Sequence, residues 1–430
     1  MNKFVELGLN EALAGALAGQ GVADPMEIQK LTIPKALAGD NFIGQAPTGT
    51  GKTLAYLLPA LQQIDPSVRQ AQVVVLAPTY ELAMQITGVA RDLAQAAELG
   101  IKVQGIIGGA NIARQIDKLK DKPQLIIGSA GRIIELARKG KLKLQQVKLL
   151  VLDEFDRLLD DQNLQSTADV VRLLPKERQI LMFSATAPNK AMERADFLEH
   201  PEHIIVKESA ATLDARENLY LMTPFRDKIG QIRKLTNSLP VKRGLVFINR
   251  TYDAEKTLAH LRFDGIKADS LLGHSNKQAR QKAIADFKSG KVQLLLSTDL
   301  AARGLDIPDV DYVFNLDLPE SAQTYQHRAG RTARAGAKGT VITLADIKEA
   351  YKLEQLEKKL GITFKGLKHK AGKESVDKAP RTAGAGRAVK ADKTDKPYKP
   401  HRANKPNKTN KPVKAAIHSK QDRQNENRSH

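Results

Sequence analysis

The segment APTGTGKT, residues 46–53, decides the fold of the first half of the chain. It follows the apolar run Phe42–Gln45, which predicts a strand, and precedes Leu54–Ile64, which predicts a helix. Glycines in such a loop let backbone N–H groups surround phosphate oxygens, and the start of the next helix adds a favourable dipole. The segment therefore predicts a phosphate-binding loop. A chance glycine-rich turn is the alternative, but here strand, Gly-Lys-Thr and helix coincide.

Two side chains of this loop have distinct predicted roles. Lys52 is suited to reach the β- and γ-phosphates of a nucleotide, and the Thr53 hydroxyl is suited to ligate Mg²⁺. The loop residues expected at the nucleotide are Ala46, Thr48, Gly49, Thr50, Gly51, Lys52 and Thr53. The general pattern has glycine where Ala46 stands.

A cluster of acidic residues, Asp153, Glu154 and Asp156, follows a second apolar run. This position is the carboxyl edge of a parallel sheet, where ligands bind in open α/β folds. Asp153 is suited to hold Mg²⁺, and Glu154 to orient or deprotonate an attacking water. Taken alone, three acids after a strand could equally cap a helix. Beside a phosphate loop, the catalytic interpretation is favoured.

Short runs that predict strands alternate with helical patterns along the first half of the chain. The predicted strands are Phe42–Gln45, Gln72–Ala77, Lys102–Ile107, Gln124–Gly128, Val147–Leu152, Gln179–Phe183 and His203–Val206. Helices are predicted between them, for example at Glu81–Leu99 and Asn111–Lys120. Several runs are apolar throughout, as expected for parallel strands buried on both faces. The alternation predicts an α/β fold with a parallel sheet.

The same pattern starts again after about Ser209. Strands are predicted at Gly244–Ile248, Lys267–Leu272, Val292–Ser297, Tyr312–Asn315 and Thr340–Leu344. Helices are predicted at Asp253–Phe263, Gln278–Phe287 and Ile347–Leu360. The predicted fold class is therefore α/β, with two tandem parallel-sheet domains. The first domain is expected at residues 1–207, a linker at 208–217 and the second domain at 218–365.

Residues 366–430 are predicted to form a disordered, Lys-rich tail. From Ala371 to His430 there are 16 Lys and Arg against 6 Asp and Glu, a net charge of +10 out of +20 for the whole chain. This stretch has only four Leu, Ile, Val or Phe residues, too few to offset chain entropy by burial. We expect it to tether polyanions non-specifically. A purely solubilising extension is the alternative.

Composition limits the remaining classes of function. The 430 residues include no cysteine, which excludes disulfides and cysteine-based metal sites. The strongly basic balance favours polyanionic partners. No apolar run approaches the ~20 residues that a membrane helix needs, and the N-terminus does not resemble a signal peptide. We therefore expect a cytoplasmic protein without membrane association.

Together these residues resemble the DEAD-box helicases of superfamily 2, from about Phe4 to Gly361. Ala46 is typical of that family at the start of the phosphate loop. The resemblance implies two RecA-like domains that bind ATP, Mg²⁺ and RNA. Gly21, Pro25, Ile28 and Gln29 resemble the family's Q motif. It implies that Gln29 reads adenine and that Phe4 packs on it.

Further motifs of the family imply roles in coupling and in the second domain. The Ser-Ala-Thr motif at residues 184–186 implies that Ser184 and Thr186, with Asp156 and His327, couple hydrolysis to strand separation. Residues 297–306 resemble motif V, and residues 327–334 resemble motif VI. The resemblance places at the nucleotide Gly304, Asp306 (on the ribose) and the arginine fingers Arg331 and Arg334. The implied catalytic set is Lys52, Asp153, Glu154, Arg331 and Arg334.

The motifs implied to contact RNA show more departures from the family. The resemblance assigns RNA contacts to Pro78, Thr79, Gly108, Gly109, Arg132, Thr251 and Thr298. The departures are Tyr80 for the usual Arg, Ala130 for Pro, Phe155 for Ala in the name-giving tetrad, and a reversed Gly273-His274. Because the three acids of the tetrad remain, ATP chemistry is expected to remain too. Tyr80 removes one phosphate-binding cation, which predicts a weaker RNA grip by the first domain.

The function implied is ATP-dependent, local and non-processive unwinding of short RNA duplexes, or remodelling of RNA–protein complexes, with little sequence preference. An ATP-gated RNA clamp or chaperone with little unwinding is the alternative, and a DNA-acting superfamily 2 enzyme is a third, less favoured hypothesis. Ribosomal and mRNA-decay complexes are both compatible partners, and no residue in the sequence favours one over the other.

Overall fold

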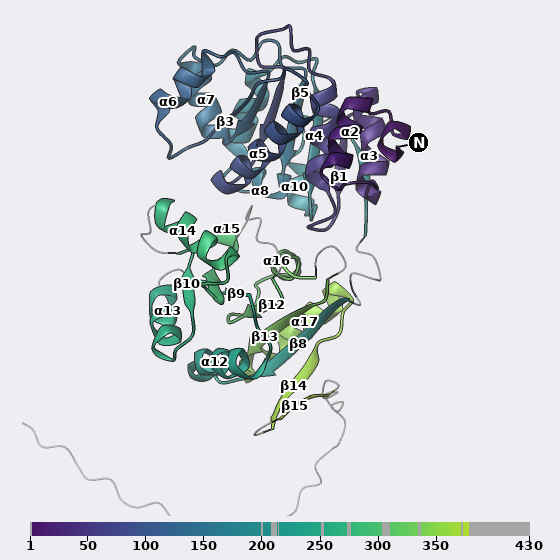
Figure 1. Cartoon of the computed structure of the whole chain (residues 1–430). Coiled ribbons are helices and arrows are strands. Elements are labelled where there is room, and N and C mark those ends of the chain that lie inside the picture. Colours follow the sequence, from purple (N-terminus) through teal and green to yellow (C-terminus); the bar gives the residue numbers. More distant parts are fainter. Residues whose placement is uncertain are drawn as a thin grey trace, which may run out of the picture. The chain divides into compact units, whose positions relative to one another are not determined.

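The structure is a computed structural model that describes residues 2–198, 201–207, 213, 215–250, 253–272, 277–302, 310–333, 337–370 and 373–377. All of these residues fall in one compact unit, Met1–Ala379. The unit contains two sheets, each built from one half of the chain (Figure 1).

The first sheet has seven parallel strands in the order β3-β4-β2-β5-β6-β1-β7. Their bounds are β1 Phe42–Gln45, β2 Val73–Leu76, β3 Val103–Ile106, β4 Leu125–Gly128, β5 Leu149–Asp153, β6 Gln179–Ser184 and β7 Glu202–Ile205. The strands β2, β4 and β5 are buried at every residue. Burial on both faces explains why their sequences are continuous apolar runs rather than alternating ones.

Helices cover both faces of this sheet (Figure 1). The helices are α1 Lys3–Glu6, α2 Glu11–Gly19, α3 Glu27–Ala38, α4 Lys52–Gln62, α5 Tyr80–Ala96, α6 Ile112–Leu119, α7 Ala130–Arg138, α8 Phe155–Leu158, α9 Leu164–Leu173 and α10 Asn189–Glu193. One core joins the sheet to α1–α5, and the other joins it to α6–α10. The loops at the carboxyl ends of the strands are thereby held on a rigid scaffold.

The second sheet has the order β10-β11-β9-β12-β13-β8-β14-β15 and is parallel except for the β14–β15 pair. Its strands are β8 Arg216–Met222, β9 Gly244–Phe247, β10 Ala268–Ser270, β11 Leu294–Ser297, β12 Tyr312–Asn315, β13 Gly339–Ala345, β14 Lys365–Lys370 and β15 Lys373–Asp377. Its helical segments are η1 Phe225–Asp227, α12 Lys228–Ser238, α13 Asp253–Phe263, α14 Lys277–Lys288, α15 Asp299–Ala302, α16 Ala322–Ala329, η2 Ile347–Glu349 and α17 Ala350–Leu360.

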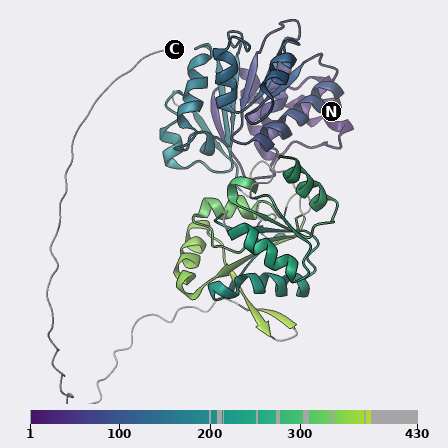
Figure 2. The ribbon, with the colours of Figure 1, turned by 90° about the vertical axis from the view of Figure 1, so that its left-hand side faces the viewer.

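The predicted α/β fold with two tandem parallel-sheet domains is confirmed, but two boundaries of the second domain differ from the prediction. β8 begins at Arg216, inside the predicted linker 208–217, because its seven residues pair with β13. The sheet also continues through β14 and β15 to Asp377, inside the predicted tail (Figure 2). β14 pairs with β8, and its Leu367 is buried in the core, which explains why this Lys-rich segment is part of the sheet.

Most of the predicted linker, residues 208–212 and 214, and the tail from residue 378 lie outside the described residues. Within the described ranges, no helix combines the length and the apolar character needed to cross a membrane.

Candidate active site

The phosphate loop joins β1 to α4, as its sequence predicts. Gly49 and Gly51 adopt φ values of 85° and 82°, the left-handed conformation that glycine accepts most readily. The ammonium group of Lys52, Nζ, donates hydrogen bonds to the carbonyl oxygens of Ala46 at 2.7 Å and Pro47 at 2.8 Å. Burial lowers the pKa of Lys52 to about 8, although Asp153 and Glu154 oppose that shift. Lys52 therefore lies folded over the start of the loop, where phosphate oxygens can replace the two carbonyls.

Asp153 ends β5 and faces the loop from the neighbouring part of the sheet. Its carboxylate accepts hydrogen bonds from the Tyr56 hydroxyl at 2.8 Å and the Glu154 backbone N–H at 3.0 Å. Burial raises the pKa of Asp153, and these two hydrogen bonds together with Lys52 oppose the rise. Burial, followed by the charge of Asp153, raises the pKa of Tyr56 well above 10. Tyr56 therefore holds the carboxylate as a hydrogen-bond donor.

Glu154 is held in an unusual environment. Its backbone has φ 53° and ψ 50°, a left-handed conformation that is strained for a residue with a side chain. Its Oε2 atom is buried and has no hydrogen-bond partner among the described residues. Burial, followed by the charge of Asp153, raises the pKa of Glu154 to about 7. A buried carboxyl with a pKa near neutrality and an unused oxygen suits a general base.

A cavity of about 210 Å³ brings these residues together with two from the second domain. Its lining comprises Thr48, Gly49, Gly51, Lys52, Thr53, Leu82, Gln85, Asp153, Glu154, Ser184, Ala185, His327 and Arg331. Gly330 also lies close to the loop, because a side chain there would meet Thr48 at 3.1 Å. Lys52 and Arg331, two cations 279 residues apart in the sequence, thus share one cavity with the carboxylates of Asp153 and Glu154.

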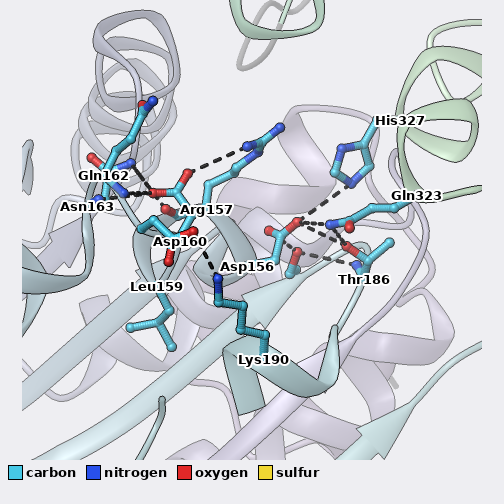
Figure 3. A network of polar contacts seen from close by, with 12 residues as sticks. Asp156, Arg157, Leu159, Asp160, Gln162, Asn163, Thr186, Lys190, Gln323 and His327 are labelled. Atoms are coloured by element: carbon cyan, nitrogen blue, oxygen red, sulfur yellow. Dashed lines mark hydrogen bonds and ion pairs between the residues drawn. The ribbon is translucent and has the colours of Figure 1, made fainter. Parts of the chain in front are cut away.

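Asp156 is the centre of a polar network beside this cavity (Figure 3). Its carboxylate accepts hydrogen bonds from Ser184 Oγ at 2.6 Å, Thr186 Oγ1 at 3.0 Å and Gln323 Nε2 at 2.6 Å. The His327 Nε2 atom lies 4.0 Å from the same carboxylate. Burial lowers the pKa of His327 to about 4, so the imidazole is neutral near pH 7. The structure thus brings together Asp156, Ser184, Thr186 and His327, the four residues expected in coupling.

Gln29 and Phe4, the two residues expected at adenine, have different surroundings. Gln29 is buried, and its amide accepts from Met26 N at 2.8 Å and donates to Gly51 O at 3.1 Å. It therefore contacts the phosphate loop directly. Phe4 is fully buried in the core with α2 and does not line the cavity, so its ring offers no free face to adenine in this structure. The sequence alone does not reveal this enclosure, because it depends on how α1 packs against α2.

The residues expected at RNA in the first domain lie where β2, β3 and β4 end. Thr79 caps α5 by accepting from Leu82 N at 3.3 Å, and Pro78 precedes it. Gly108 N donates to Ser129 Oγ at 3.3 Å, and Gly109 adopts φ 70°. Because parallel strands end at the same edge, these loops share one edge of the sheet.

Two further expected RNA residues, Arg132 and Thr298, also make contacts within the protein. Arg132 donates to the Ala110 carbonyl at 3.1 Å and pairs with Glu135 at 3.0 Å. In the second domain, Thr298 caps α15 by accepting from Ala301 N at 3.3 Å. Both are therefore positioned by the fold without a ligand. Thr251, Gly273, His274, Gly304, Asp306 and Arg334 lie outside the described residues.

The structure describes the surroundings of three residues at which a departure from the family's motifs is expected. Phe155 is fully buried in the core that joins the sheet to α7 and α9. Tyr80 starts α5 and is half buried, and Ala130 starts α7. The bulk of Phe155 is accommodated within the core, and Phe155 is not among the residues that line the cavity.

Sequence reasoning missed Tyr56, Gln323 and Arg328. Arg328 is 1% exposed and donates to Asp299 at 2.7 and 2.8 Å and to Asn249 at 2.7 Å. Its position inside motif VI is the signal that the sequence offers, but the motif by itself does not separate Arg328 from the neighbouring arginines. Tyr56 and Gln323 lie in ordinary helical sequence and carry no such signal.

Comparison with known proteins places these features in a family. Residues 26–195 match the family described as DEAD/DEAH box helicase, and residues 227–336 match the helicase conserved C-terminal domain. The DEAD-box ATP-dependent RNA helicase CshC of Bacillus cereus is 41% identical over 346 residues, covering 80% of this chain and 88% of that protein. The probable ATP-dependent RNA helicase YfmL of Bacillus subtilis is 37% identical over 354 residues, covering 82% and 93%.

A solved structure agrees with these relatives. Dbp5 of S. cerevisiae, bound to RNA and ADP BeF3, superimposes with a TM-score of 0.77 at 30% identity, covering 85% of this chain and 95% of that one. The fold, the shared cavity and the close relatives agree, and this chain belongs to the DEAD-box family of ATP-dependent RNA helicases.

Proposed function

We propose that the chain hydrolyses ATP to drive local, non-processive unwinding of short RNA duplexes or remodelling of RNA–protein complexes. The observation that carries this proposal is the cavity in which Lys52, Asp153 and Glu154 of the first domain meet Arg331 of the second. A site assembled from both domains makes hydrolysis depend on how the domains are held. Such dependence is the physical requirement for converting ATP turnover into work on RNA.

The residues present suit ATP with Mg²⁺. Phosphate oxygens would take the place of the two carbonyls that Lys52 now contacts, and the loop glycines expose N–H groups to them. Mg²⁺ prefers oxygen ligands, which the Thr53 hydroxyl and the Asp153 carboxylate supply. The partnerless Oε2 of Glu154 beside them is consistent with a site that is completed by a ligand. When bound, the ion would neutralise charge that develops on the transferred phosphate.

Glu154 is proposed to position and deprotonate the attacking water, and Arg331 with Arg334 to stabilise the developing negative charge. The raised pKa of Glu154 suits proton abstraction near neutral pH. Guanidinium groups meet phosphate oxygens bidentately, and an arginine supplied across a cleft can accelerate such reactions by ~10³–10⁵. The place of Arg331 in the cavity lining supports this assignment.

RNA is proposed to bind the loops that contain Pro78, Thr79, Gly108 and Gly109, together with Arg132, Thr251 and Thr298. Contacts from backbone N–H groups and hydroxyls recognise phosphate and ribose, so we expect little sequence preference and a preference for RNA through its 2′-hydroxyl. The network around Asp156 supports coupling, because it joins Ser184 and Thr186 of the first domain to His327 of the second beside the nucleotide cavity.

Replacement of Glu154 by Gln tests the proposal. It keeps the shape of the side chain but removes the base, so we expect RNA-stimulated phosphate release to fall by ~10²–10⁴. The exposed Glu177→Gln is the matched control, because it removes the same charge from the same domain. Wild-type protein that binds RNA with ATP but releases no phosphate above background would favour the alternative, an ATP-gated RNA clamp. Crosslinking the protein to its bound RNAs in cells would show whether it acts in ribosomal or in mRNA-decay complexes.

A further inference from the structure

A second groove lies on the first domain, along the edge strand β3 between α5 and α6. We call it the edge groove, and it is lined by Tyr80 and Arg91 of α5, Gly109 and Asn111 of the loop after β3, and Arg114 and Lys118 of α6. Its volume is about 400 Å³. This size is within the range of ligand-binding clefts in proteins.

The walls of the edge groove are fixed by internal hydrogen bonds. Gln115 of α6 is buried and accepts from Ile107 N at 3.1 Å while donating to Ile107 O at 3.0 Å. The Asn111 side chain caps the same helix by accepting from Arg114 N at 3.2 Å. On the opposite wall, Arg91 Nε donates to the Val103 carbonyl of the edge strand at 3.1 Å. The groove is therefore part of the fold.

The lining of the edge groove carries positive charge without a compensating acid. Arg91, Arg114 and Lys118 all contribute to it, whereas none of the residues that line it is Asp or Glu. Arg114 and Lys118 stand four residues apart and so lie on the same face of α6. All three cations are exposed. This charge pattern fits a polyanion rather than an acidic or neutral partner.

The edge groove is continuous with the residues proposed to bind RNA. Tyr80 directly follows Thr79, and Gly109 is itself one of the proposed RNA residues, yet both line the groove. A strand of RNA that leaves these two loops would therefore meet the groove next. Tyr80 adds an aromatic face, on which single-stranded bases can stack without regard to sequence.

We propose that the edge groove binds the backbone of single-stranded RNA that continues beyond the contacts of Thr79 and Gly109. This inference rests on the proposed function and deepens it by extending the RNA site to α6. Arg114 and Lys118 then supply cations on the domain where Tyr80 has replaced the usual Arg. Stacking on Tyr80 and charge from α6 together recognise an unpaired, flexible strand.

The double substitution Arg114→Ala with Lys118→Ala tests this proposal in the full chain. Lys141→Ala with Lys143→Ala is the matched control, because these exposed lysines precede β5 and so lie towards the amino ends of the strands. We expect the groove variant to bind a long oligouridylate roughly three- to tenfold more weakly at low salt, and the slope of affinity against salt to decrease by about 1.4 for two lost phosphate contacts. A short oligouridylate that ends at the domain contacts should be affected less.

Two outcomes would overturn the proposal. One is a groove variant that binds the long oligouridylate as tightly as wild type, and the other is a loss no greater than that of the control. If wild-type protein shows RNA-stimulated ATP hydrolysis while the groove variant behaves like the control, only the groove proposal fails. If wild type shows neither RNA binding nor RNA-stimulated hydrolysis, the proposed function fails with it. Tyr80→Phe, compared with Tyr80→Ala, tests the part played by the aromatic ring, because only the Phe variant should retain long-RNA affinity.

Discussion

Gln323 of α16 donates hydrogen bonds of 2.6 Å to both Asp156 and Thr186. The Asp156 carboxylate already accepts hydrogen bonds from two hydroxyl groups, and the Gln323 amide adds a third donor without adding charge. Gln323→Glu would place a second carboxylate against Asp156, so we expect RNA-stimulated ATP hydrolysis to fall roughly tenfold near neutral pH. The loss should shrink as pH falls, because the introduced carboxyl group, once protonated, again donates a hydrogen bond. Phosphate release relative to wild type across pH measures both effects.

Gln326→Glu is the matched control for this substitution. Gln326 belongs to the same helix but is exposed, so the added charge meets solvent instead of Asp156. Equal loss in the two variants would show that charge on α16 matters in general. If the loss of ATP hydrolysis in the Gln323 variant does not change with pH, the hydrogen bond to Asp156 does not account for it.

The site residues divide into those that a short motif predicts and those that only the fold reveals. Lys52, Asp153 and Glu154 were predictable because a strand followed by their motif fixes where the side chains point. Tyr56 and Gln323 could not be found in this way, because their partners lie 97 and 167 residues away in the chain. Such contacts depend on how helices pack, which no local pattern specifies.

At the scale of elements, central strands were the most predictable features. β1 and β12 have the predicted bounds, and the other predicted strands differ by up to two residues at an end. β8 escaped detection because its first three residues, Arg216, Glu217 and Asn218, are charged or polar, so that the strand contains no long apolar run. β14 escaped because lysines dominate its composition, and only pairing with β8 gives it a place in the sheet.

Helix α16 shows how a polar sequence can be a core element. Arg328 is buried, donates to Asp299, Asn249 and the Asp317 carbonyl, and lies over the Phe247 ring at 5.1 Å. Lysine keeps the charge but not the fork of donors, so Arg328→Lys should leave acceptors unpaired and lower the free energy of unfolding by about 1–3 kcal/mol. Chemical denaturation measures this loss.

Arg262→Lys provides the comparison for that prediction. Arg262 also pairs with an aspartate in the second domain, Asp269 at 3.0 Å, but its side chain is 53% exposed. Water can replace its hydrogen bonds, so we expect a change in unfolding free energy below about 1 kcal/mol. A comparable loss in both variants would mean that the buried donors of Arg328 have no special role.

For the molecule as a whole, the new boundary at Asp377 defines where the predicted tail can be removed. Ending the chain after Asp377 keeps β14 and β15, whereas ending it near Lys370 would cut the pair apart. If the tail tethers RNA through its charge, the shortened chain should bind RNA more weakly at low salt and with a shallower dependence on salt. Equal affinity of the two chains at low salt would instead support a solubilising role.

The neutral imidazole of His327 predicts how the assembled molecule responds to acid. Burial lowers the pKa of this imidazole to about 4. The charge of Asp156 opposes the shift, and the weaker effects of the cations Arg331, Arg157 and Lys52 reinforce it. Because the folded pKa is below the ordinary 6.5, the unfolded chain takes up the proton first, and stability is lost as pH falls from about 6.5 towards 4.

His327→Asn removes the proton-binding group while keeping a neutral polar side chain. Between about pH 6.5 and pH 5, wild type should therefore lose about 1.6 kcal/mol more unfolding free energy than this variant. Chemical denaturation at the two pH values measures the difference, and His260→Asn, at an exposed position, should follow wild type. If His327→Asn is as sensitive to acid as wild type, the pKa of His327 is the same in the folded and the unfolded protein, and burial does not hold the imidazole neutral.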